Sequence, residues 1–133
     1  MRPKNSPTSC PKLHFDEKGL IPAVIVDIES GKVLTLCYMN KEAVKKTLET
    51  GKVYVFRRSQ GRVMQKGEIS GHTQTLREIY VDCEENSLLI KVEQKLAACH
   101  LGYFTCYFRK FNPQTKQLEI VEEKIFSPEE VYK

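Results

Sequence analysis

Hydrophobic and polar positions along this chain form short stretches rich in β-branched and aromatic residues, separated by turn-forming residues, and this pattern predicts strands. Residues 19–27 and 33–39 are the first two such stretches, and the polar turn Glu29-Ser30-Gly31-Lys32 between them predicts a hairpin. Further strands are expected over residues 53–58, 62–64, 75–81, 88–93, 103–111 and 117–121.

One segment has a helical period instead. Asn40 can cap a helix, Val44 and Leu48 recur at i and i+4, and Gly51 supplies a stop, so we expect a helix over about Lys41–Thr50. One helix and many strands predict an α+β, mainly β fold, with the antiparallel strands in a compact single domain.

With 133 residues, the chain has the length of one domain. Residues 1–12 are rich in proline and polar residues and lack the apolar core of a secretory signal, so we expect a disordered lead-in. The main domain is expected over residues 13–111. Residues 112–133 are expected to form a C-terminal strand and tail packed on it, with a short helix after Ser127.

Composition restricts the classes of function. The hydrophobic fraction is 41%, without an apolar run of the roughly 18 residues that a membrane span needs. The net charge of +4 suits a small anionic molecule better than a nucleic acid. Five cysteines without a signal peptide indicate reduced thiols in the cytoplasm, where Cys37 is expected to be a core thiol and Cys10 a bystander.

The other three cysteines suggest a metal site. Cys99 follows Cys83 by 16 residues and Cys106 follows Cys99 by 7. Three thiolates can hold one zinc ion and leave its fourth position free for a water molecule. Two alternatives remain open at this stage: a closed structural zinc site with His100 as the fourth ligand, and buried thiols without a metal.

The segment 66–74 combines glycines with polar side chains and lacks a clear period, so it is a candidate ligand loop. Lys66, Ser70 and backbone N–H groups could receive phosphate oxygens, whereas the alternative is an ordinary surface turn. His72 in this segment and His100 beside Cys99 are candidate proton carriers. Three nearby arginines either add to phosphate binding or form a solvated strand face: Arg57, Arg58 and Arg62.

These motifs together resemble those of the phosphoribosyl-AMP cyclohydrolase family, over about residues 13–109. The resemblance is carried, in order and spacing, by Gly19-Leu20-Ile21-Pro22-Ala23, Tyr38-Met39-Asn40, Lys66-Gly67-Glu68, Ser70-Gly71-His72, Gln74, Asp82-Cys83, Cys99-His100 and Cys106.

The resemblance implies an enzyme of histidine biosynthesis that opens the adenine ring of phosphoribosyl-AMP at the N1–C6 bond and yields the ProFAR intermediate. It also implies a homodimer in which Cys83, Cys99 and Cys106 bind zinc across the subunit interface, with magnesium held by acidic residues around the first cysteine. His100 or His72 would then move protons. The nucleotide would be held by Lys66, Ser70, Gln74 and Arg58.

The chain departs from the family in two places. Where three aspartates are usual, it has Asp82, Glu84 and Asn86. On an extended backbone these alternate residues would share one side opposite Cys83, but the neutral amide and the longer Glu84 should weaken magnesium binding. The usual tryptophan, tryptophan and serine positions hold Phe56, Met64 and Arg57.

These departures keep two alternatives open. The chain could be a diverged paralogue that acts on another purine-type nucleotide. It could also be a non-catalytic, zinc-stabilised dimer that binds a nucleotide or a protein.

Overall fold

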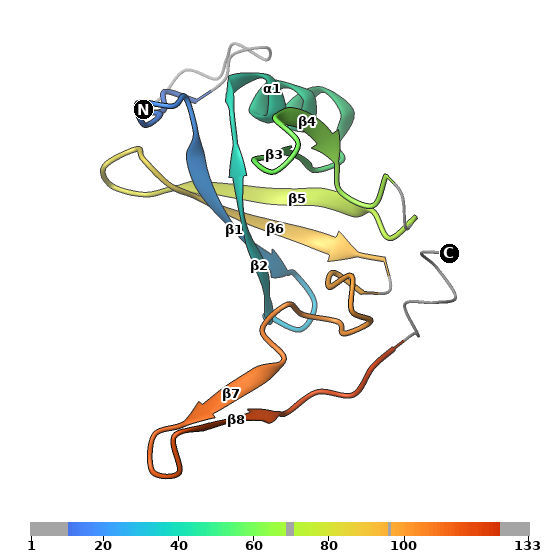
Figure 1. Cartoon of the computed structure of the whole chain (residues 1–133). Helices are drawn as coiled ribbons and strands as arrows, with labels where there is room; N and C mark the ends of the chain where they lie inside the picture. Colours follow the sequence, from blue (N-terminus) through green and yellow to red (C-terminus); the bar gives the residue numbers. More distant parts are fainter. Residues whose placement is uncertain (1–10, 69–70, 96, 126–133) are drawn as a thin grey trace.

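A four-stranded sheet forms the centre of the computed structural model, which describes residues 11–68, 71–95 and 97–125 (Figure 1). The strand order is β2-β1-β6-β5. The strands of this sheet are β1 (Ile21–Asp27), β2 (Val33–Met39), β5 (Gln74–Val81) and β6 (Leu88–Gln94). The other elements are α1 (Lys41–Thr50) and two separate hairpins, β3 (Tyr54–Arg57) with β4 (Arg62–Gln65) and β7 (Arg109–Asn112) with β8 (Gln117–Ile120).

The mainly β, α+β class is confirmed, with one difference in strand direction. β1 pairs antiparallel with β2, but it pairs in parallel with β6, so the central sheet is mixed. The parallel pair arises because the chain leaves the sheet after β2, forms α1 and the β3–β4 hairpin, and returns through β5 to β6. Among the described residues, no helix is long and apolar enough to cross a membrane.

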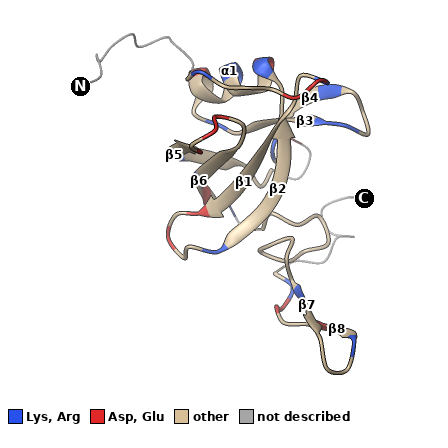
Figure 2. Ribbon diagram, turned by 90° about the vertical axis from the view of Figure 1, so that its left-hand side faces the viewer, with Lys and Arg blue, Asp and Glu red and all other residues tan. Residues whose placement is uncertain are grey.

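The core lies between the central sheet and the layer formed by α1 with the β3–β4 hairpin. Alternate residues of β1 point into it, and Ile21, Ala23 and Ile25 are fully buried. Ile90 of β6 and Val53 before β3 are also fully buried and belong to the same cluster. The β7–β8 hairpin, in contrast, extends away from this body in two views (Figures 1 and 2).

The expected strand over residues 103–111 is wrong in its first half, because only Arg109–Asn112 forms a strand there. The preceding segment folds back on itself, with Gly102 N–H donating to Cys99 O at 3.0 Å and Gly102 at a φ of 101°. Residues 1–10 and the helix expected after Ser127 lie outside the described residues, and the domain boundaries stay a prediction.

The helix begins and ends where the sequence predicts. The Asn40 side chain accepts a hydrogen bond from Ala43 N–H at 2.8 Å, and Gly51 ends the helix in the left-handed conformation with a φ of 76°. Inside the helix, the buried Thr47 hydroxyl donates to Ala43 O at 2.8 Å and accepts from Tyr54 N–H at 2.9 Å. This hydroxyl therefore joins α1 to the first residue of β3.

Replacing Thr47 by valine should lower the free energy of unfolding by about 1–3 kcal/mol, because the Tyr54 N–H would be left without its acceptor in a buried position. Thr47→Ser is the matched control, since it keeps the hydroxyl. Urea unfolding of both variants measures the difference, and equal stability of Thr47→Val and wild type would refute this role of the hydroxyl.

Candidate functional site

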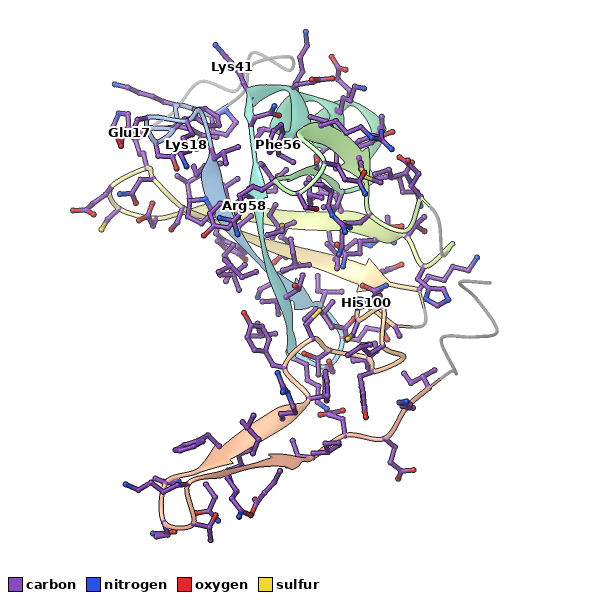
Figure 3. All side chains as sticks on the ribbon, in the orientation of Figure 1. Glu17, Lys18, Lys41, Phe56, Arg58 and His100 are labelled. Atoms are coloured by element: carbon purple, nitrogen blue, oxygen red, sulfur yellow. The ribbon has the colours of Figure 1, made fainter. Side chains whose placement is uncertain are left out.

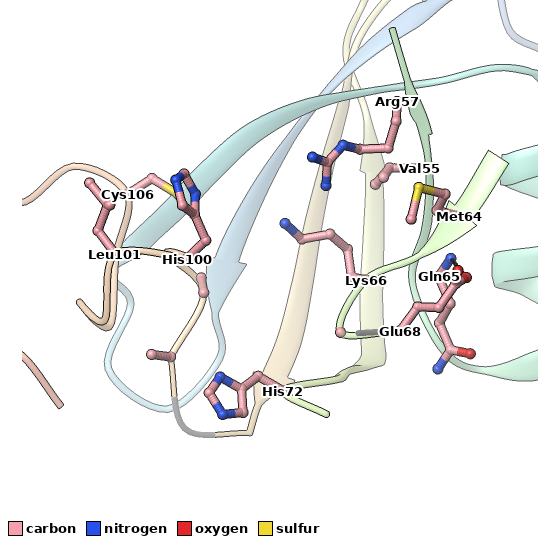
Figure 4. A pocket seen from close by; sticks show the side chains of 13 residues that line it. Val55, Arg57, Met64, Gln65, Lys66, Glu68, His72, His100, Leu101 and Cys106 are labelled. Atoms are coloured by element: carbon pink, nitrogen blue, oxygen red, sulfur yellow. Dashed lines mark hydrogen bonds between the residues drawn. The ribbon is translucent and has the colours of Figure 1, made fainter. Parts of the chain in front are cut away.

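A cavity of about 460 Å³ lies between the β3–β4 hairpin and the segment that follows β6. Its walls come from three parts of the chain: the β3–β4 hairpin with the loop after it, the residue His72 before β5, and the turn from Ala97 to Cys106 (Figure 4). The site is therefore assembled from segments that are far apart in sequence, which sequence spacing alone does not reveal.

Two histidines line this cavity from different walls. His72 is buried, with 8% of its surface exposed, and His100 is exposed on the turn after β6 (Figure 4). The structure thus brings together both histidines that the sequence singled out as proton carriers. Each could reach a ligand in the cavity from a separate side.

Four residues were expected to bind substrate, and of the three that the structure describes, only Lys66 lines the cavity. The Arg58 guanidinium lies 4.0 Å from the centre of the Tyr38 ring, and its side chain is well separated from His100 (Figure 3). Gln74 is fully buried and donates to the Gln94 side chain at 2.7 Å. Ser70 lies outside the described residues.

Arg57 is the cavity residue to which sequence reasoning gave too little weight. It lines the cavity together with Val55, two positions earlier on the same strand. The signal was present in the alternation of the strand, because residues two apart point to the same face. Sequence reasoning considered Arg57 with Arg58 and Arg62, and it assigned the nucleotide to Arg58 instead of Arg57.

The three candidate zinc ligands do not meet within one chain. The Cys99 and Cys106 thiols are neighbours. Burial, together with the neighbouring Cys106 thiol, raises the pKa of the Cys99 thiol. Cys83 is exposed on the turn between β5 and β6, at the other end of the sheet (Figure 1). Within the described residues, no group of three histidine, cysteine or acidic side chains is arranged to hold a metal ion.

Cys37 is a core thiol near the cavity wall. Burial raises the pKa of this thiol to about 12, and the nearby Lys66 ammonium opposes the shift only in part. Cys37 is therefore protonated at neutral pH. Its place in the central sheet agrees with the sequence expectation.

The expectation of an extended backbone at the magnesium candidates is wrong, because residues 82–87 form a turn. Asp82 Oδ1 accepts hydrogen bonds from Asn86 N–H at 2.8 Å and Ser87 N–H at 3.0 Å, and Glu85 has a φ of 60°. Desolvation of Asp82 opposes ionisation, but these backbone donors outweigh it and lower the pKa of its carboxyl group. The Asp82 carboxylate therefore stabilises the turn that carries Cys83.

Comparison with known proteins identifies the family. The family model for phosphoribosyl-AMP cyclohydrolase matches residues 35–108. The chain is 48% identical to the phosphoribosyl-AMP cyclohydrolase of Methanosarcina barkeri, with 92% of this chain and 95% of the relative covered. It is 46% identical to the protein of the same name in Chlorobaculum parvum, with 89% and 85% covered.

A longer relative also matches. The histidine biosynthesis bifunctional protein HisIE of Caldanaerobacter subterraneus subsp. tengcongensis is 49% identical over 84% of this chain, and the chain spans 55% of the length of that protein. The match to the family model covers residues from β2 to Phe108 and so includes the cavity walls, both histidines and all three candidate zinc ligands. The chain therefore belongs to the phosphoribosyl-AMP cyclohydrolase family.

Proposed function

We propose that this protein opens the adenine ring of phosphoribosyl-AMP by adding water at C6 and breaking the N1–C6 bond, as a step of histidine biosynthesis that yields the ProFAR intermediate. The observation that carries the proposal is the cavity in which His72, His100, Lys66 and Cys106 meet. Family membership selects this reaction among those that such a cavity could support. The free thiols of the described cysteines suit a reducing compartment, which supports a cytoplasmic location.

The reaction needs two proton movements. A water molecule must lose a proton as its oxygen bonds to C6, and N1 must gain a proton as its bond to C6 breaks. His72 and His100 line different walls of the cavity, so one can accept the first proton while the other supplies the second. The buried position of His72 favours a fixed orientation, whereas the exposed His100 can exchange protons with solvent.

The paired thiols of Cys99 and Cys106 suit a zinc ion, because thiolate sulfur is a preferred zinc ligand. One chain supplies two ligands, and Cys83 of a second chain would supply the third. A bound zinc ion would lower the pKa of a water molecule held at its open position. The thiol protons of the pair would be released when the ion binds.

We also propose a weak magnesium site at Asp82, Glu84 and Asn86. One oxygen of Asp82 is occupied by two backbone donors of its own turn, which leaves its second oxygen for an ion. Glu84 and Asn86 are exposed on the same turn. Because magnesium demands near-ideal octahedral geometry, this donor set favours weak binding completed by water.

The homodimer proposal is supported by an open face of the central sheet. On the face opposite the core, Tyr80, Leu89, Val24 and Leu36 pair in register and form one apolar row across all four strands. Leu36 and Tyr80 are 44% and 49% exposed. A sheet face with such a row is typical of a surface that another polypeptide covers.

The β7–β8 hairpin offers a second open apolar surface. Phe111 and Leu118 pair directly and share a face with Ile120, and these three side chains are 53%, 56% and 63% exposed. The opposite face carries Lys110 and Glu119. Because a two-stranded hairpin is marginally stable by itself, the apolar face is expected to lie against another surface.

The proposed occupant of both surfaces is a second copy of the chain. The hairpin begins three residues after Cys106, and Tyr80 lies three residues before Cys83. A hairpin laid on the open sheet face of the partner would therefore bring the Cys99–Cys106 pair of one chain toward the Cys83 turn of the other. Two-fold symmetry would repeat the contact and create two equivalent sites.

Two inactive cysteine variants should restore activity when they are combined. Cys83→Ser and Cys99→Ser are each expected to abolish ring opening and zinc binding, whereas Cys37→Ala should keep both. In a mixed dimer, both substitutions fall in one site and the other site is intact. Co-refolding equal amounts should therefore recover about a quarter of wild-type activity.

The measurement is the ultraviolet change on ring opening of phosphoribosyl-AMP, with zinc content determined on the same samples. A wild-type protein without turnover would refute the proposed reaction. A mixture that stays inactive would refute shared ligation while leaving the reaction itself in place.

A charge on the apolar face of the hairpin should dissociate the dimer. Leu118→Glu places a carboxylate on the surface that we expect to be buried, and burial of an unpaired charge costs several kcal/mol. Gln117→Glu is the matched control on the opposite face. Sedimentation velocity should show a monomer for Leu118→Glu and a dimer for Gln117→Glu, and a dimer for both would refute this surface.

Gly67, in the loop after β4, packs closely against the backbone of His72, which belongs to the next wall of the cavity. A Cβ atom at Gly67 would lie 2.5 Å from the carbonyl carbon of His72, and the φ of Gly67 is 85°. Gly61 also has a positive φ, of 64°, but a Cβ atom there would meet no other atom within 4 Å. An alanine at Gly61 therefore introduces the backbone strain without the close contact and serves as the control.

Gly67→Ala should therefore displace His72 and reduce kcat at least tenfold, a barrier increase of about 1.4 kcal/mol or more. Gly61→Ala should cost only about 1–2 kcal/mol of stability and keep kcat. Steady-state kinetics and thermal unfolding of the two variants provide the test, and an equal loss of kcat in both would contradict the assigned role of Gly67.

A further inference from the structure

We propose that Arg57 and Lys66 together bind one phosphate monoester of the substrate, and that Arg57 is the residue that determines recognition of this group. The inference rests on the proposed function of the same cavity and extends it to a phosphate subsite. It is carried by the positions of these two cations on the cavity wall and by the distribution of charge around them.

Strand alternation places Arg57 on the cavity side of the β3–β4 hairpin. Val55 and Arg57 are two residues apart in β3, and Val55 pairs with Met64 of β4. All three line the cavity. Phe56, between Val55 and Arg57, belongs to the other face of the hairpin.

The charge of Arg57 is placed unfavourably for the fold. Arg57 pairs directly with Arg62 across the hairpin, and like charges at such a position are destabilising. Arg62 is compensated, because its Nη2 lies 3.3 Å from Glu68 Oε2. Among residues 11–68, 71–95 and 97–125, Arg57 forms no salt bridge, and the basic character of the hairpin is visible in Figure 2.

Lys66 adds a second positive charge to the same space. Figure 4 shows the side chains of Arg57 and Lys66 extending from the hairpin toward the wall that carries His100. Within the described part of the chain, Lys66 also lacks a salt-bridge partner. Glu68 is the one carboxylate among the described residues that line the cavity, and it is engaged by Arg62 and by the Gln65 N–H at 3.3 Å.

Two uncompensated cations facing one cavity repel each other, and a dianion between them would remove that repulsion. A guanidinium donates two parallel hydrogen bonds to phosphate oxygens, whereas an ammonium acts as a point charge. Arg57 is thus suited to fix the orientation of the group and Lys66 to add attraction. Arg58 is directed elsewhere, over the Tyr38 ring.

Phosphoribosyl-AMP contains two ribose phosphates, one in its AMP part and one in its phosphoribosyl part. Both offer the same chemistry to Arg57 and Lys66. The two parts can be tested separately with AMP and ribose 5-phosphate as probes, and adenosine serves as the probe that lacks a phosphate.

The experiment measures the dissociation constants of these three probes by calorimetry for the zinc-loaded wild-type protein and for Arg57→Gln, Arg57→Lys and Arg77→Gln. Arg77 is the control arginine, because it lies on β5 and pairs with Glu93 at 2.6 Å. Arg57→Gln should weaken one of the two phosphate probes about ten- to a hundredfold. Arg57→Lys should weaken the same probe less, and Arg77→Gln should change no probe.

The probe that is weakened identifies the phosphate that Arg57 binds. The proposal is overturned if neither phosphate probe binds the wild type, if Arg57→Gln changes neither, if it weakens both equally, or if it weakens adenosine as much as AMP. Calorimetry measures the binding of these probes and does not require turnover. An inactive wild type whose phosphate binding depends on Arg57 would therefore refute the proposed reaction and leave this subsite in place.

Discussion

The site depends on how the segment after β6 is fastened to β2. Cys106 N–H donates to Leu34 O at 2.7 Å, and the Thr105 hydroxyl donates to Val33 O at 2.7 Å. Thr105 is buried, so losing its bond would leave a polar group without a partner in the interior. These bonds hold the turn that carries Cys99 and His100 against the cavity, opposite the β3–β4 hairpin.

The same arrangement supports the proposal that two chains together form the zinc site. The turn that is fastened to β2 supplies two thiols, and the third lies on a different turn at the far end of the sheet. Two apolar surfaces remain uncovered near these turns, one on the open sheet face and one on the β7–β8 hairpin. In the proposed dimer, a symmetric pair of chains would cover both surfaces and complete both sites, so that activity would require assembly.

The positive charge on the β3–β4 hairpin is unfavourable for the fold and is the basis of the proposed phosphate subsite. Two arginines face each other across the strands, and among the described residues only Arg62 of the two has a carboxylate to neutralise it. The hairpin would gain stability from losing Arg57, which is a common property of binding residues whose charge is compensated by the ligand. In the proposed subsite, a bound phosphate would supply the compensating negative charge at this point of the cavity wall.

The sequence by itself determined the elements whose signals are local. The helix from Lys41 to Thr50 follows from Asn40, its apolar spacing and Gly51, and the first hairpin follows from its turn residues. The family and the residues that carry its motifs were also evident from the sequence. These features depend on neighbours in the chain, so they could be predicted before the fold was known.

Only the tertiary structure decided which of these residues meet. It made the β1–β6 pair parallel, turned residues 103–108 away from a strand, and placed Arg57 in the cavity while Arg58 stacked on Tyr38. It also separated Cys83 from the other two thiols. The physical reason is that these positions are set by strand pairing, burial and hydrogen bonds between distant segments. These long-range contacts outweigh the local conformational preferences that the sequence shows.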